Sequence, residues 1–93
     1  MKKHLQKKIT NDLSIVAIDI SIALLGVTVT FRYLDEYEFE AYYERYAPSF
    51  KWMSTDNLTE RMSVDVELEI EQNEKEIVEW LETQFLAEQY ATA

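Results

Sequence analysis

Cysteine is absent from this chain of 93 residues, and glycine, proline and histidine occur once each. Without cysteine, neither a disulfide framework nor a thiolate metal site can form, which fits a reducing compartment. A single histidine, His4, excludes a Ser-His-Asp triad and the usual zinc spacings. No glycine-rich loop is available to cradle a phosphate. We therefore expect a protein without enzymatic activity, cofactor or metal.

Positive charge is scarce and unevenly placed. The chain has eighteen acidic and nine basic residues, and four of the nine lie at the very start, at Lys2, Lys3, Lys7 and Lys8. From residue 9 onward, five basic residues face eighteen acidic ones. Solubility alone needs a net charge of only about 2–8 in a small domain, and a larger excess repels nucleic acid and anionic membranes. The pattern predicts a basic N-terminal arm over 1–12, one acidic domain over 13–93, and basic partners.

Long hydrophobic runs are limited to residues 13–31, which contain a single charge, Asp19. This length is near the minimum of about 17–20 residues for a membrane span. A central carboxylate would cost about 2.5–3.5 kcal/mol there, and the Ile, Val and Thr content favours strands. We therefore expect a strand hairpin, with a helix as the alternative, and no membrane span.

Alternation predicts most of the sheet. The even positions from Val16 to Leu24 are uniformly apolar, which indicates a strand with one buried face. Gly26 is then the expected hairpin turn, and a second strand alternates from Val27 to Tyr33. Residues 37–41 favour a third strand, with a helix through Tyr46 as the competitor and Pro48 as the stop.

The C-terminal half predicts one more strand and a helix. Residues 48–60 are expected to form a loop or a short helix, and residues 63–71 alternate apolar and acidic side chains as in a strand. Asn73 is the expected N-cap of a helix to about Gln89, with Ile77, Leu81 and Phe85 on its apolar face. The predicted fold is α+β: an antiparallel sheet of about four strands with a C-terminal amphipathic helix on its apolar face.

Two rows of carboxylates stand out in this prediction. On a strand, alternate side chains are about 6.6 Å apart, so neighbouring carboxylates repel by roughly 0.6 kcal/mol in water. A solvated face usually mixes signs, whereas a regular row of negative charge resembles a nucleic-acid backbone. Solvation and protection against edge pairing are the alternative explanation. The residues expected to bind a partner are Asp65, Glu67, Glu69 and Glu71 in one row, and Glu36, Glu38 and Glu40 in the other.

Aromatic side chains lie beside the second row and offer rigid contact area, although packing in the core is the more frequent role. The weaker candidates for partner contact are Tyr42, Tyr43, Tyr46 and Trp52.

Size, charge and carboxylate spacing together resemble the small acidic proteins that viruses and mobile elements use against host nucleic-acid enzymes, although no motif indicates a named family. The leading hypothesis is a DNA-mimic inhibitor of the anti-restriction or anti-CRISPR type. It would act in the cytoplasm, the host's if the protein is viral, by blocking the groove of a basic nucleic-acid-binding protein without touching nucleic acid itself. The alternatives are a small virion-type assembly protein that homo-oligomerises through its sheet edges, and a membrane-anchored acidic domain.

Overall fold

The computed structural model describes residues 2–47 and 49–91. The chain forms a five-stranded antiparallel sheet in the order β1-β2-β3-β4-β5, followed by two helices. The α+β class is confirmed, but the sheet has five strands instead of about four, and two helices follow it instead of one. The elements are β1 Lys2–Lys8, β2 Leu13–Ile20, β3 Gly26–Tyr33, β4 Tyr37–Glu44, β5 Ser49–Ser54, α1 Glu60–Gln72 and α2 Glu74–Ala91.

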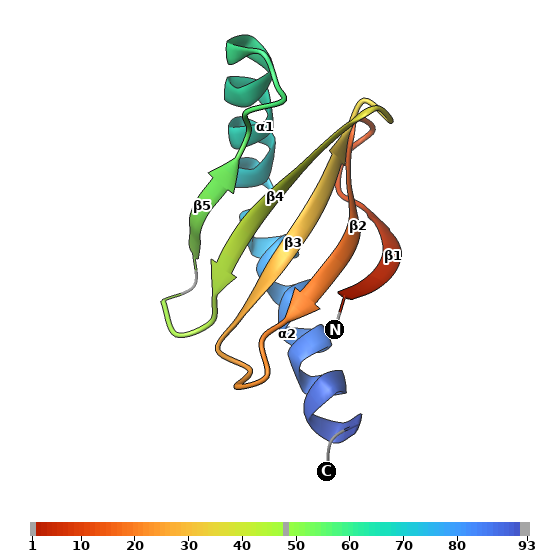
Figure 1. The fold of residues 1–93 in the computed structure, drawn as a ribbon, viewed down its shortest axis with the longest axis vertical. Helices are drawn as coiled ribbons and strands as arrows, with labels where there is room; N and C mark the ends of the chain where they lie inside the picture. Colours follow the sequence, from red (N-terminus) through yellow and green to blue (C-terminus); the bar gives the residue numbers. More distant parts are fainter. Residues whose placement is uncertain (1, 48, 92–93) are drawn as a thin grey trace.

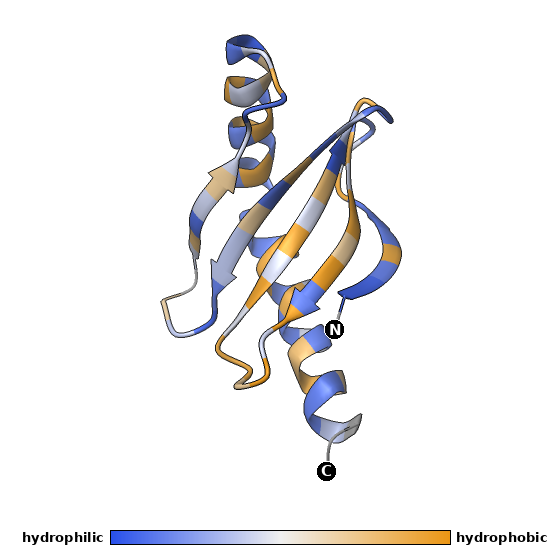
Figure 2. Ribbon diagram, in the orientation of Figure 1, coloured by the Kyte–Doolittle hydropathy of each residue, from blue (hydrophilic) through white to orange (hydrophobic). Residues whose placement is uncertain are grey.

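Both helices cover the same face of the sheet, and the other face is open (Figure 1). In Figure 1, α2 crosses behind the sheet, whereas much of α1 extends beyond one end of it. One core cluster joins the two layers, and hydropathy alternates along the central strands as expected for a sheet covered on one side (Figure 2). Its buried members are Leu13, Ile15, Ile18, Val27, Val29, Phe31, Tyr33, Phe39, Ala41, Tyr43, Val66, Ile70, Ile77, Leu81 and Phe85.

A bulge in β2 explains why the expected buried face of this strand was only partly right. The pairing with β3 shifts between Ile15 and Ala17, so Val16 is the extra residue. Odd positions face the helices before the bulge and even positions, such as Ile18, face them after it. Ile22, expected on the buried face, lies beyond the strand and is fully exposed.

The β2–β3 hairpin is confirmed, but Gly26 is the first residue of β3 and not part of the turn. The left-handed position in this loop is Leu24, with φ 57°. Gly26 has no positive φ, and its role is to leave space: a Cβ there would lie 2.8 Å from the carbonyl oxygen of Tyr43 and against the ring of Tyr42. Glycine is required here by close packing, not by backbone conformation.

Residues 2–8 of the predicted basic arm form strand β1. β1 pairs antiparallel with β2, from Lys2 opposite Asp19 to Lys8 opposite Ser14. The lysines of this edge strand discourage pairing with another sheet.

The segment 63–71 is helix α1, so the strand predicted there was wrong. Thr59 is the N-cap, and its hydroxyl accepts a hydrogen bond from the Met62 amide at 3.1 Å. Val66 and Ile70, four residues apart, face the core, whereas Val64 and Leu68 are half exposed. Residues 49–54, expected in a loop or short helix, are instead strand β5, and Pro48 lies outside the described residues.

The helix predicted from residue 74 is confirmed as α2, with Ile77, Leu81 and Phe85 completely buried. Asn73 separates the two helices, and its carbonyl accepts the first bond of α2 from the Ile77 amide at 3.0 Å. The side-chain amide of Asn73 donates to the backbone carbonyl of Glu69 at 2.8 Å, so Asn73 caps the C-terminus of α1. Within residues 2–47 and 49–91, no helix combines the length and apolar character needed to cross a membrane.

Candidate protein-binding surfaces

The negative charge of the protein is concentrated on its helices. Residues 2–54, which form the sheet, contain seven acidic and seven basic residues. Residues 60–91, which form α1 and α2, contain ten acidic and two basic residues, a net charge of −8. Because the helices share one face of the sheet, the molecule has an acidic helical side and a nearly neutral sheet side.

The four carboxylates of the first predicted row lie on two different sides of helix α1. Residues four apart lie on the same side of a helix. Asp65 and Glu69 therefore share one side of α1, and Glu67 and Glu71 share another. Asp65 and Glu69 are half buried, whereas Glu67 and Glu71 are exposed. The four do not form one continuous row, and only Glu67 and Glu71 are placed for unrestricted contact with a partner.

The half-buried pair lies beside the sheet at Tyr33. Burial raises the pKa of the Tyr33 phenol, and the negative charges of Asp65, Glu69 and Asp12 raise it further. The Thr10 hydroxyl donates to Oε1 of Glu69 at 2.9 Å, while Oε2 of Glu69 is buried and has no hydrogen-bond partner among the described residues. These contacts join α1 to the β1–β2 and β3–β4 ends of the sheet, so this pair has a structural role.

The exposed side of α1 carries Glu60, Glu67 and Glu71. In the described part of the chain, no Lys or Arg nitrogen forms an ion pair with any of the three. Val64 and Leu68, about half exposed, lie between them along the helix. The exposed side of α1 therefore presents unpaired carboxylates interspersed with aliphatic contact area, and we call Glu60, Val64, Glu67, Leu68 and Glu71 the α1 stripe.

Two carboxylates of α2 are used to hold this helix against the sheet. The Arg45 guanidinium donates two hydrogen bonds to the Glu82 carboxylate, from Nε to Oε2 at 3.2 Å and from Nη2 to Oε1. The same guanidinium lies 4.9 Å from the centre of the Phe85 ring. The hydrogen bond with Glu82 raises the pKa of Arg45, and the Glu82 charge adds to burial in raising the pKa of Tyr43. Glu76 forms a longer ion pair with Lys7 at 3.4 Å.

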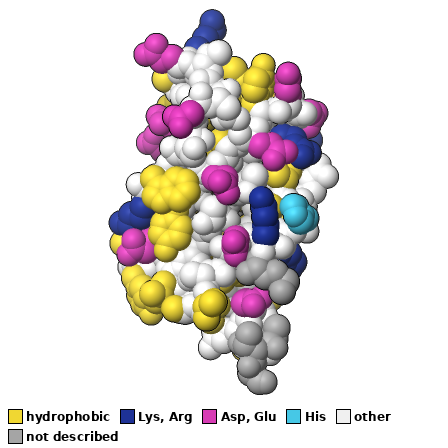
Figure 3. Space-filling view, viewed as in Figure 1, with side chains coloured by type: hydrophobic (Ala, Val, Ile, Leu, Met, Phe, Trp, Pro, Cys, Tyr) yellow, Lys and Arg dark blue, Asp and Glu magenta, His cyan; other side chains and the backbone are white. Residues whose placement is uncertain are grey.

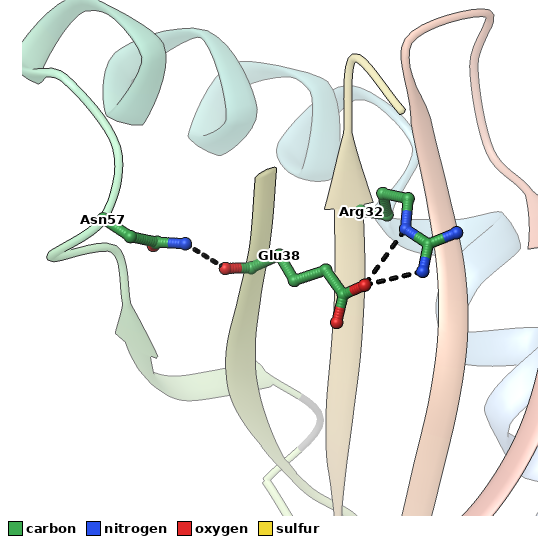
Figure 4. Close-up of polar contacts among 3 residues, drawn as sticks. All are labelled: Arg32, Glu38 and Asn57. Atoms are coloured by element: carbon green, nitrogen blue, oxygen red, sulfur yellow. Dashed lines mark hydrogen bonds and ion pairs between the residues drawn. The ribbon is translucent and has the colours of Figure 1, made fainter. Parts of the chain in front are cut away.

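The second predicted row is only partly present as a row. Glu38 and Glu40 project from the open face of β4, whereas Glu36 lies in the β3–β4 turn. Glu38 is already neutralised, because Arg32 donates to its Oε2 at 3.1 Å from Nε and 2.6 Å from Nη2 (Figure 4). Its backbone carbonyl also accepts from the Asn57 amide (Figure 4).

The aromatic candidates separate into buried and exposed side chains. Tyr43 is buried in the core, so it cannot contact a partner as predicted. Tyr42 and Trp52 stack on the open face with ring centres 6.2 Å apart, and Trp52 is 48% exposed. Tyr46 is largely exposed in the loop after β4. Figure 3 views the molecule from this open side and shows hydrophobic side chains gathered at its left.

The described surface contains hollows on both sides of the sheet edge formed by β1. One hollow, of about 410 Å³, lies between the β1–β2 edge and α2 and is lined by Lys2, Lys3, Ile18, Ile20, Gln84, Ala87 and Glu88. Among residues 2–47 and 49–91, no group of three or more His, Asp or Glu side chains is arranged to hold a metal ion.

Comparison with protein-family models, with curated proteins and with solved structures finds no match for this chain.

Sequence reasoning missed Glu60 and the aliphatic members of the α1 stripe. The signal was present: Met62, Val66 and Ile70 recur every four residues, and Thr59 precedes them as an N-cap. Residues 64–71 also alternate apolar and acidic side chains, and this two-residue pattern was given more weight than the four-residue spacing.

Proposed function

We propose that this protein is a small acidic binding protein that acts as a DNA mimic, with its helices occupying the basic nucleic-acid groove of a partner protein. The single observation that carries the proposal is the partition of charge, with a net −8 on the helices and none on the sheet. The class of function is inhibition by occupancy, as in proteins that viruses and mobile elements direct against host defence or repair enzymes, and no reaction is involved.

The density of charge supports a nucleic-acid mimic. At 1.5 Å per residue, the 13 residues of α1 and 18 of α2 extend over about 46 Å of helix. The net charge of −8 over that length corresponds to one charge per about 5.8 Å, compared with 3.4 Å per phosphate along one DNA strand. The helices thus carry somewhat more than half the linear charge density of one DNA strand, on a scaffold that needs no ordering when it binds.

The placement of the carboxylates also reduces the stability of the fold. Glu67 and Glu71 are like charges four residues apart, which destabilises a helix by about 0.2–0.5 kcal/mol. Glu69 and Glu71 lie near the C-terminus of α1, where the helix dipole disfavours negative charge by about 0.3–1 kcal/mol each, and no basic residue is present in that turn. Solubility does not require this arrangement, whereas binding to a basic groove does.

The proposal is tested by capture and displacement. The tagged protein is immobilised and exposed to cell lysate at low salt, and the retained proteins are challenged with duplex DNA or with an uncharged polymer. We expect retained proteins that bind nucleic acid and that DNA releases at concentrations where the neutral polymer does not. Retention of proteins that DNA fails to displace would contradict a mimic.

A further inference from the structure

Of the nine large hydrophobic side chains that are exposed in the described part of the chain, five lie at one end of the molecule. They belong to the β2–β3 loop, the loop after β4 and the last turns of α2, which Figure 1 shows together at the lower end of the sheet. Arg45 joins these segments, because its amide donates to the carbonyl of Leu25 at 2.9 Å and its guanidinium is paired with Glu82 of α2. We call this surface the apolar end, and its members are Ile22, Leu25, Tyr46, Leu86 and Tyr90.

The β2–β3 loop is fixed in a conformation that exposes its isoleucine. The Ser21 hydroxyl accepts hydrogen bonds from the amides of Leu25 at 3.0 Å and Gly26 at 3.2 Å. Leu24 has a φ of 57°, which is unfavourable for a leucine, and its side chain packs against the core. Ile22, by contrast, is fully exposed at 103%. A large apolar side chain that an ordered and strained loop holds in solvent is placed for contact with another molecule.

The three segments of the apolar end are nearly free of charge, unlike the rest of the protein. Residues 20–31 and 46–50 contain no charged side chain, and residues 83–91 contain only Glu88, although 29% of the whole chain is charged. Solubility favours charged residues at exposed positions, whereas an exposed cluster of large apolar side chains is typical of a contact surface.

The apolar end continues into the acidic helical side. Leu86 is seven residues and Tyr90 eleven residues after Glu79, so the three lie along one side of α2. Glu79 is exposed, and it forms no ion pair with any Lys or Arg that the structure describes. A partner that lies along this side of α2 therefore meets a carboxylate and then apolar contact area.

We propose that the apolar end docks into an apolar pocket bordered by basic residues, on the same protein that the acidic helices bind, so that this inference rests on the proposed function. Charge complementarity selects this occupant, because lysines or arginines around the pocket would meet the carboxylates of α2. A second copy of this chain and an anionic membrane surface both carry negative charge, which the helices repel.

The two contact surfaces have different kinetic roles. Attraction by the helix carboxylates acts at long range, so it raises the association rate and is screened by salt. Apolar side chains that fill a pocket act only after contact, so they slow dissociation. Tyrosine is enriched among the residues that dominate binding energy, and Tyr46 and Tyr90 are 78% and 79% exposed. The apolar end therefore sets the dissociation rate of the complex.

The test measures association and dissociation rates by surface plasmon resonance against a protein that DNA displaces in the capture experiment above. The variant carries Ile22→Ser and Tyr90→Ser, two substitutions of exposed side chains that keep the charge. The matched control is Leu34→Ser, because Leu34 is 47% exposed in the β3–β4 turn at the opposite end of the sheet. The double variant should dissociate at least about ten-fold faster, with an unchanged association rate and salt dependence, whereas the control should behave like the wild type.

Thermal melts by circular dichroism establish that both variants are folded. A folded double variant that dissociates no faster than the control would overturn the docking of the apolar end and leave the proposed function standing. If DNA displaced none of the captured proteins, the proposed function would fail and this inference with it. Self-association of the wild type, or its co-sedimentation with phosphatidylcholine vesicles, that the double variant abolishes would assign the apolar end to another occupant and overturn the proposal as well.

Discussion

The phenol of Tyr33 illustrates how single residues tie the acidic helix to the sheet. It is 7% exposed and is surrounded by the carboxylates of Asp12, Asp65 and Glu69. Burial and these charges both disfavour the phenolate, so the pKa of Tyr33 is raised above its ordinary value of 10.0 in the folded protein. A raised pKa in the folded state means that folding favours the protonated form.

The pH dependence follows from that sign. The contribution of Tyr33 to stability is fully present below about pH 10, and it is lost as the pH rises through the higher pKa of the folded state. We expect Tyr33→Phe to lose less stability than the wild type between neutral pH and pH values above 10, because a phenylalanine has no proton to release. Urea unfolding midpoints at both pH values provide the measurement. Equal losses in the two proteins would mean that Tyr33 ionises freely.

At the scale of elements, α2 is held by a simple apolar stripe. Ile77, Leu81 and Phe85 are each completely buried against the sheet. We expect Leu81→Ala and Phe85→Ala each to lower the free energy of unfolding by about 2–5 kcal/mol, because each leaves a cavity in the core. Urea melts measure this loss, and Glu79→Ala on the exposed side is the matched control, expected within about 0.5 kcal/mol. Losses as small as the control's would show that α2 is not docked through this stripe.

The start of α1 is held by one hydrogen bond from a side chain. Because the Thr59 hydroxyl accepts from the Met62 amide at 3.1 Å, Thr59→Ala should destabilise the protein by about 0.5–2 kcal/mol. Thr83→Ala, within α2, removes a similar side chain without removing a cap and serves as the control. Thermal unfolding measures both changes. If Thr59→Ala cost no more than Thr83→Ala, a helix beginning at Glu60 would be contradicted.

The elements also show where sequence reasoning succeeds. β3 was predictable because Val27, Val29 and Phe31 alternate with Thr28 and Thr30, a pattern that no helix satisfies. α2 was predictable because its apolar residues recur only with the helical period. In α1, residues 64, 66, 68 and 70 are all apolar and fit a strand as well, and only packing decides that Val66 and Ile70 are buried while Val64 and Leu68 are not. β1 was missed because an edge strand can consist largely of lysine when a neighbour supplies its hydrogen bonds.

At the scale of the whole molecule, composition predicted the amount of negative charge but not its location. The first row, expected on a strand, lies instead on helix α1, which places Asp65 and Glu69 on a different side from Glu67 and Glu71. The set of side chains that share the open face was also beyond prediction, because it follows from strand registers and a bulge. The acidic helices and this open face lie on opposite sides of the sheet.

The most direct test of the central claim compares two triple charge reversals of equal magnitude on opposite sides of the protein. One is Glu60→Lys, Glu67→Lys and Glu71→Lys on the α1 stripe, and the other is Glu36→Lys, Glu40→Lys and Glu44→Lys on the sheet. Each is titrated over a series of salt concentrations against a partner that DNA displaces. We expect the α1 variant to lose at least about ten-fold in affinity and to show a flatter salt dependence of the association rate, while the sheet variant binds like the wild type. An α1 variant that is folded and keeps both the wild-type affinity and the wild-type salt dependence would contradict the claim that the helices are the binding surface.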